Sequence, residues 1–177
     1  MKKIFVFILS ALFFLSCGSA PSKSEEPANP VATQEASGFS ITLDKIDGGT
    51  FSFEDIRGKK HLVAAFWATW CEPCKQELKK LAEMYGEFSD SVEFVGISTD
   101  TEEMTDKVNE FAAEAALPFP ILVDPSGNTV SSIIPGGDSV PYMIIVDKNG
   151  VIVSRHSGYN PGDEESLKRE LKELVSH

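Results

Sequence analysis

Two hydrophobic patterns follow one another in the N-terminal half of the chain. Apolar and polar residues alternate over residues 39–43 and again over residues 50–53, with Asp47-Gly48-Gly49 between the two stretches. Alternation with a period of two is typical of a half-buried strand, and an Asp-Gly step between two such strands is typical of a hairpin turn. Residues 61–67 are almost entirely apolar, which indicates a central strand covered on both faces.

Helical spacing of apolar residues dominates three later stretches. The first is predicted to end at Gly86, since glycine commonly terminates a helix. The second opens with Asp100-Thr-Glu-Glu103, which resembles a capping box with Asp in place of Ser or Thr, and it stops before Pro118. The third is a C-terminal helix with an acidic first turn at residues 163–165. A brief helix is also predicted over residues 128–134.

Short apolar stretches between these helices predict four further strands, at residues 92–97, 119–123, 142–146 and 151–153. Asp147-Lys-Asn-Gly150 joins the last two, and its Asn-Gly step indicates a hairpin. Strands that alternate with helices and end in an antiparallel pair imply a mixed central sheet with helices on both faces. The predicted fold class is therefore α/β, with an extra N-terminal β-hairpin.

The first 38 residues show neither pattern. Lys2-Lys3, the apolar residues 4–15 and the small Ser16 before Cys17 form a processing signal, with an apolar stretch too short to span a bilayer. Residues 18–38 are rich in Ser, Pro, Ala and Glu and are predicted to be a disordered tether. We therefore predict a signal peptide over 1–17, a tether over 18–38 and a folded domain over 39–177.

Phe14-Leu-Ser-Cys17 resembles a bacterial lipobox, in which the cysteine is lipidated and becomes the mature N-terminus. It departs from the usual pattern because Phe14 stands three residues before the cysteine, where Leu is expected. Ordinary signal cleavage nearby and an uncleaved anchor are the alternatives. Lipid on Cys17 would place the protein on a membrane of the bacterial cell envelope, facing the periplasm or extracytoplasmic space.

Charge narrows the range of partners. The formal net charge is −11 at pH 7. Phosphate binding needs clustered Lys and Arg, so nucleic acid is not expected as a partner.

Cys71-Glu-Pro-Cys74 lies between the predicted strand 61–67 and the helix that follows it. Free N–H groups and the helix dipole stabilise a thiolate at such a position, so Cys71 is predicted to be the exposed attacking thiol. Cys74 lies one turn further on, where it could resolve a mixed disulfide. The chain has three cysteines, and lipid on Cys17 would leave these two as a single redox pair.

Other uses of the pair are less well supported. A disulfide that closes a four-residue loop removes little conformational entropy from the unfolded chain, so a purely structural disulfide here would add little stability. Zinc needs more ligands than the motif supplies, and Lys75 stands where a c-type haem attachment motif needs His. We therefore predict no metal and no cofactor.

Val140-Pro141 introduces the strand at residues 142–146. Proline at the first residue of a strand, near a redox motif, suggests a cis peptide that leaves a backbone edge for a substrate chain. A trans turn proline is the alternative.

Residues 66–77, with the sequence Phe-Trp-Ala-Thr-Trp-Cys-Glu-Pro-Cys-Lys-Gln-Glu, resemble the TlpA/ResA-type thiol–disulfide oxidoreductases of bacterial envelopes. The similarity extends over about residues 39–175. It implies a thioredoxin-like fold, Cys71 and Cys74 as the redox pair, a cis-proline at Pro141 and a role for Glu77 in proton handling. It also implies a membrane-tethered enzyme that reduces disulfides in exported proteins, with cytochrome c maturation as a candidate process. The protein is expected to be a monomer. Its electrons would come from a membrane thiol reductant.

Two acidic residues bear on how such a site would work. Glu77 follows Cys74 by three residues and so lies on the same side of the helix. A partly buried carboxylate there could accept the Cys74 proton; a solvated helix-face glutamate is the alternative. Thioredoxin has a buried Asp where this chain has Ala65, so proton transfer must come from elsewhere. Glu72 beside Cys71 disfavours a very low thiol pKa, which favours a reductase over an oxidase.

Neighbouring residues complete the predicted site. Trp70, Glu72 and Pro73, together with Val140 and Pro141, are predicted to form the substrate surface, whereas Trp67 is expected beneath the motif. His61 and His156 are interpreted as structural.

Two other functions fit the sequence less well. A peroxiredoxin-like thiol peroxidase needs a Thr-x-x-Cys setting, and Thr69 is not three residues before either cysteine. A non-catalytic binding lipoprotein with a thioredoxin fold would not need the intact pair.

Overall fold

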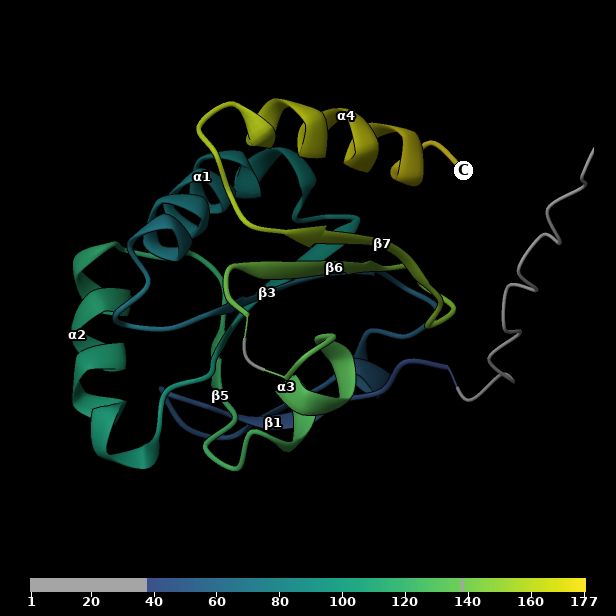
Figure 1. The fold of residues 1–177 in the computed structure, drawn as a ribbon. Coiled ribbons are helices and arrows are strands. Elements are labelled where there is room, and N and C mark those ends of the chain that lie inside the picture. The colour runs from purple at the N-terminus through teal and green to yellow at the C-terminus, as the bar shows by residue number, and fades with distance from the viewer. Residues whose placement is uncertain (1–37, 138) are drawn as a thin grey trace, which may run out of the picture. The chain divides into compact units, whose positions relative to one another are not determined.

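A seven-stranded mixed sheet is the centre of the fold in the computed structural model (Figure 1). The structure describes residues 38–137 and 139–177. The predicted signal peptide with Cys17, and nearly all of the predicted tether, lie outside these residues. The strands are β1 (Thr42–Lys45), β2 (Thr50–Ser52), β3 (His61–Trp67), β4 (Val92–Ser98), β5 (Ile121–Val123), β6 (Tyr142–Val146) and β7 (Ile152–Ser157).

Strand order in the sheet is β2-β1-β5-β4-β3-β6-β7. The three central strands β3, β4 and β5 are parallel, and antiparallel strands flank them on both sides. The N-terminal strands β1 and β2 form the predicted hairpin and extend one edge of the sheet. The predicted mixed sheet with an extra hairpin is thus confirmed.

Every residue of β3 is buried, as its apolar sequence predicts. Successive side chains of a strand point to opposite faces, so Val63, Ala65 and Trp67 belong to one core and their neighbours to the other. The core that contains Trp67 also contains Cys71 and Cys74.

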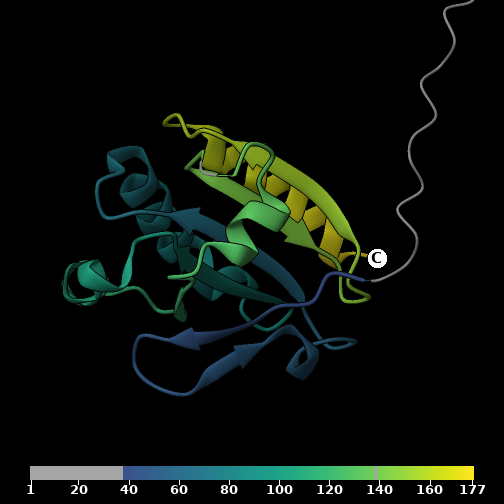
Figure 2. The same cartoon turned by 60° about the horizontal axis from the view of Figure 1, so that its bottom comes forward.

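Among the described residues, four α-helices cover the sheet: α1 (Glu72–Phe88), α2 (Thr105–Glu114), α3 (Asn128–Ile133) and α4 (Asp163–Val175). Buried residues of α1, α2 and α4 belong to the core on the Trp67 face. The helix α3 packs on the opposite face, together with the hairpin, and Figure 2 shows α3 and α4 on opposite sides of the sheet. Helices on both faces agree with the predicted class.

Two predicted helix boundaries were wrong. The first helix continues past Gly86 to Phe88, because Phe88 is buried in the core and Ser89 caps the helix by donating its N–H to the Tyr85 carbonyl. Asp100 and Glu103 form no capping box, because the Asp100 carboxylate accepts hydrogen bonds from Thr69 instead. A short 3-10 turn, Glu102–Met104, precedes α2 in its place.

Within the described residues, no helix is both long enough and apolar enough to cross a membrane.

Candidate active site

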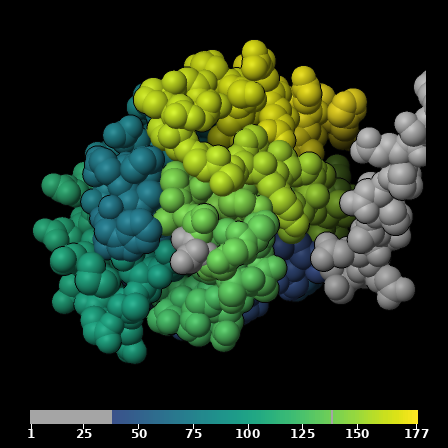
Figure 3. Space-filling view, viewed as in Figure 1, coloured from purple at the N-terminus to yellow at the C-terminus, as the bar shows by residue number. Residues whose placement is uncertain are grey.

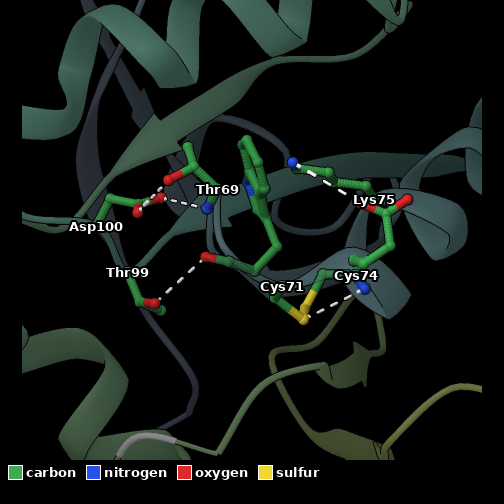
Figure 4. Close-up of a disulfide and its surroundings, with 8 residues drawn as sticks. Thr69, Cys71, Cys74, Lys75, Thr99 and Asp100 are labelled. Carbon is green, nitrogen blue, oxygen red and sulfur yellow. Dashed lines mark hydrogen bonds and ion pairs between the residues drawn. A yellow bond between two sulfur atoms is a disulfide. The ribbon is translucent and has the colours of Figure 1, made fainter.

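Cys71 and Cys74 are joined by a disulfide at the start of α1 (Figure 4). Cys71 is the N-cap residue, and its Sγ accepts a hydrogen bond from the Cys74 N–H at 3.3 Å. Pro73 falls in the first turn, where the missing N–H costs little. The Cys71 side chain faces the free N–H groups of the helix, as the sequence predicts for a stabilised thiolate.

The two cysteines are both buried in this oxidised form. Cys71 is 5% exposed and Cys74 is fully buried. The prediction of an exposed Cys71 was therefore wrong for the disulfide state, because its sulfur is bonded to Cys74 and packs in the core below the loop. Of the two cysteine residues, Cys71 is still the more exposed.

The residues of the motif that are predicted to contact substrate are exposed. Trp70 is 70% exposed, the largest exposure of any large apolar side chain in the described residues. Glu72 and Pro73 are also exposed, and the Glu72 carboxylate lies 4.0 Å from the Lys75 ammonium. The predicted substrate surface thus has an aromatic side chain next to the cysteines.

Pro141 lies at the end of β3 from which the cysteine loop leaves, although it is 67 residues from Cys74 along the chain. Tyr142 pairs with Phe66 in antiparallel register, which places Pro141 next to the end of β3. The Val140–Pro141 peptide bond is cis, and the Pro141 carbonyl accepts a hydrogen bond from Gly158 at 2.9 Å. Figure 3 shows the segment before β6, in green, against the blue-teal segment that begins α1.

Glu77 lies on the buried side of α1, the side that also carries Cys74. Its side chain is 5% exposed, and Oε2 has no hydrogen-bond partner among the described residues. Burial raises the pKa of Glu77 to about 8, with the negative charge of Asp163 as a smaller cause. A solvated helix-face glutamate is thus excluded.

A cavity of about 230 Å³ adjoins Glu77, between α1, the end of β7 and the start of α4. Its lining includes Lys80, His156, Tyr159 and Asp163. Tyr159 donates its hydroxyl to Glu164 at 3.0 Å, and burial together with this acceptor raises the Tyr159 pKa to about 12. The sequence places Asp163 only in the acidic first turn of the C-terminal helix and indicates no role for Tyr159, since nothing in the local sequence indicates that α4 returns to α1.

The remaining predicted residues have packing roles. Trp67 is fully buried, with its ring centroid 5.0 Å from that of Phe111. His61 lies at the start of β3, the strand end opposite to the cysteines, and burial lowers its pKa. His156 contacts Glu170 at 2.9 Å. In the described part of the chain, no group of three or more His, Cys, Asp or Glu is placed to hold a metal ion.

A family model matches residues 32–155, which is more than two thirds of the chain, and its description is the AhpC/TSA family. The chain belongs to the AhpC/TSA family. Two curated relatives extend the similarity. The thioredoxin-like protein YneN of Bacillus subtilis is 36% identical over 140 residues, covering 78% of each chain. The thiol-disulfide oxidoreductase ResA of Halalkalibacterium halodurans is 29% identical over 136 residues, covering 76% of this chain and 73% of ResA.

The fold of this AhpC/TSA member is thioredoxin-like, as the sequence resemblance implied. A crystal structure of a putative thiol:disulfide interchange protein DsbE from Chlorobium tepidum superposes with a TM-score of 0.70 at 24% identity. The match covers 78% of this chain and 96% of that one. The family, the ResA-type relatives and the Cys71–Cys74 pair together identify the chain as a thiol–disulfide oxidoreductase.

Proposed function

We propose that this oxidoreductase reduces disulfides in exported proteins while it is anchored to a bacterial membrane by lipid on Cys17. The observation that carries the proposal is a Cys71–Cys74 disulfide at the N-terminus of α1 with the buried Glu77 on the same helix. Exported protein disulfides are the proposed substrates, and a membrane thiol reductant is the proposed electron donor. The haem-binding cysteines of apocytochrome c are one candidate substrate of this class.

Reduction would proceed by two thiol–disulfide exchanges. The Cys71 thiolate attacks one sulfur of the substrate disulfide, forms a mixed disulfide and releases the other substrate sulfur as a thiolate. Cys74 then loses its proton and attacks Cys71 Sγ, which releases the second substrate thiolate and closes the Cys71–Cys74 bond. Two electrons thereby pass from the enzyme to the substrate, and the thiol donor restores the dithiol by the reverse exchange.

Glu77 would carry the proton of Cys74 in both directions. With a pKa of about 8 it is mostly protonated near neutral pH, so it can protonate the Cys74 sulfur when the donor opens the disulfide. The resulting carboxylate can take the same proton back when Cys74 attacks the mixed disulfide. Ala65, fully buried in the core that contains Cys74, supplies no alternative acid.

Reduction is favoured over oxidation by charge near Cys71. A strong oxidant needs a highly stabilised thiolate. Glu72 stands in the first turn of α1, where its negative charge opposes ionisation of the neighbouring thiol. The Lys75 ammonium lies 4.0 Å away and offsets only part of this charge.

A thiol peroxidase is less well supported by the site. The Thr69 hydroxyl donates to Asp100 at 2.7 Å, and Thr69 precedes Cys71 by two residues. The Thr69 hydroxyl therefore donates its hydrogen bond to Asp100 and not to the Cys71 sulfur.

Insulin reduction with dithiothreitol as electron donor tests the proposed activity. We expect the purified protein to accelerate insulin precipitation, Cys71→Ser to abolish the acceleration and Cys17→Ser to retain it. Activity that persists in Cys71→Ser would refute the proposed role of this cysteine.

Trapping identifies the substrates. Cys74→Ala leaves Cys71 joined to its substrate, because the resolving thiol is missing. We expect exported proteins with paired cysteines among the mixed-disulfide partners. A trap without apocytochrome c would remove cytochrome maturation from the proposal.

A further inference from the structure

A buried carboxylate joins the ends of the two central strands that lead to the active site (Figure 4). Asp100 is 7% exposed and follows β4 by two residues. Its Oδ2 accepts hydrogen bonds from the Thr69 N–H at 2.8 Å and from the Ser98 hydroxyl at 2.9 Å. Its Oδ1 accepts the Thr69 hydroxyl at 2.7 Å.

The register of the sheet creates this contact. Trp67 and Ser98 are paired across parallel β3 and β4, so the carboxyl ends of both strands lie side by side. Thr99 adds to the connection, since its N–H and its hydroxyl both donate to the Trp67 carbonyl, at 2.9 and 3.3 Å. Residues 98–100 therefore hold the loop that leaves β3.

That loop carries Cys71. Thr69 precedes Cys71 by two residues, and the Cys71 N–H donates to the Ala68 carbonyl at 3.0 Å to close the turn between them. Fixing Thr69 therefore restricts where the Cys71 backbone can lie at the N-terminus of α1. Trp70, between them, projects into solvent.

The chemistry of residue 100 matches the donors around it. An ionised carboxylate has acceptor sites for three donors and offers no hydrogen that would repel them. A buried charge is costly unless it is hydrogen-bonded, and the three hydrogen bonds that the Asp100 carboxylate accepts come from Thr69 and Ser98 at this end of the two strands. A neutral amide would offer a single acceptor oxygen to the same three donors.

We propose that Asp100, acting through Thr69, is a positioning residue that keeps Cys71 at the first turn of α1 when the disulfide is open. The inference rests on the proposed dithiol–disulfide cycle. In the oxidised form the bond to Cys74 restrains Cys71, but this restraint is absent from the reduced enzyme that attacks substrate. The hydrogen bonds that the Asp100 carboxylate accepts from Thr69 do not involve the disulfide, so they hold the nucleophile in both states, and small displacements of a reacting group reduce rates steeply.

Thr69→Val is the first test, because it removes the hydroxyl without changing charge or shape. The full chain carrying Cys17→Ser and Cys74→Ala has Cys71 as its only thiol, and its rate of alkylation by iodoacetamide is measured against pH. We expect Thr69→Val to slow alkylation about fivefold and to raise the apparent pKa of Cys71, and Thr69→Ser to restore both. An unchanged rate and pKa in Thr69→Val would overturn the proposal.

Asp100→Asn, measured in the same background, separates positioning from charge. Loss of a nearby negative charge alone would lower the Cys71 pKa. Loss of positioning slows alkylation, and we expect about a tenfold decrease. Faster alkylation with a lowered pKa would overturn the proposal.

Asp124→Asn is the matched control. Asp124 is also buried, follows β5 of the same sheet and accepts from the Ser126 hydroxyl and the Val130 N–H, both at 3.0 Å. Those bonds order α3 and not the cysteine loop, so we expect destabilisation with unchanged Cys71 alkylation. An equal loss of alkylation in both variants would mean that general destabilisation explains the result, against the proposal. Alkylation needs no disulfide substrate, so absence of insulin reduction by the wild type would refute the proposed function without affecting this test.

Discussion

At the scale of single residues, Glu77 shows both what the sequence predicts and what it does not. Its spacing from Cys74 predicts the shared helix side, and the structure places both residues on the buried side of α1. Its burial could not be predicted, because it lies at a cavity whose lining includes Tyr159 and Leu167, which are more than 80 residues away along the chain. This long-range packing therefore decides whether the Glu77 carboxylate is solvated or buried.

Glu77 should make folding stability depend on pH. The unfolded chain releases this proton near the ordinary pKa of 4.5, whereas the folded chain retains it to about pH 8. The stabilisation is therefore complete below pH 4.5 and is lost as pH rises through 8. At about 1.4 kcal/mol per pH unit the loss is roughly 5 kcal/mol over this window.

Denaturant unfolding of Glu77→Gln measures this contribution. We expect the variant to lose most of the wild-type decline in unfolding free energy between about pH 5 and pH 9. Glu83→Gln, on the exposed side of the same helix, should keep the wild-type slope. Parallel pH dependence in wild type and Glu77→Gln would show that Glu77 ionises at its ordinary pKa in the folded protein.

Asp163 should contribute to the same property. Its negative charge is the second cause of the raised Glu77 pKa, after burial. Asp163→Asn should therefore lower the Glu77 pKa while leaving it above 4.5, as followed by NMR of the carboxyl carbon. Glu165→Gln, in the same helical turn but outside the cavity lining, is the control. A Glu77 pKa that is equal in Asp163→Asn and wild type would mean that burial alone sets it.

At the scale of elements, packing decides what local signals leave open. The hydrophobic pattern predicts each strand and each α-helix, since burial imposes periods of two and 3.6 residues. Residues that commonly end or cap a helix predicted the helix boundaries less well. Gly86 remains helical because Phe88 beyond it is buried, and Asp100 bonds to the cysteine loop instead of capping a helix.

Surface ion pairs and a buried leucine both join α1 and α4, and their contributions to stability can be compared by mutation. Glu87 of α1 pairs with Lys168 and Lys172 of α4 on the surface, while Leu171 of α4 is fully buried below them. Exposed ion pairs contribute little, whereas loss of a buried leucine leaves a cavity. We expect Leu171→Ala to lower the unfolding free energy by about 2 to 5 kcal/mol and Glu87→Gln to have no measurable effect in denaturant titrations. The reverse order would show that the surface pairs hold α4 in place.

At the scale of the whole molecule, the sequence predicts the architecture better than the active-site geometry. The order of strands and helices is sufficient for a mixed sheet, because parallel connections follow a single handedness and few topologies remain. The approach of Pro141 to the cysteines depends on the register between β3 and β6, and the contact of Asp100 with Thr69 on that between β3 and β4. Register is not encoded in any one segment, so these contacts required the structure.

The proposed lipid anchor would determine where in the cell the folded domain meets its substrates. Residues 18–38 would link a lipid on Cys17 to the domain and keep Cys71 close to the membrane that supplies electrons. Stable anchoring by lipid requires more than one acyl chain, so the proposed lipid on Cys17 would have to supply them. In cells, we expect the wild type to sediment with membranes and Cys17→Ser to appear in the soluble fraction with its insulin reductase activity intact. Cys71→Ser, which removes the nucleophile and not the lipid site, should remain with the membranes. A Cys17→Ser protein that still sediments with the membranes would show that an uncleaved apolar segment, and not lipid, holds the enzyme there.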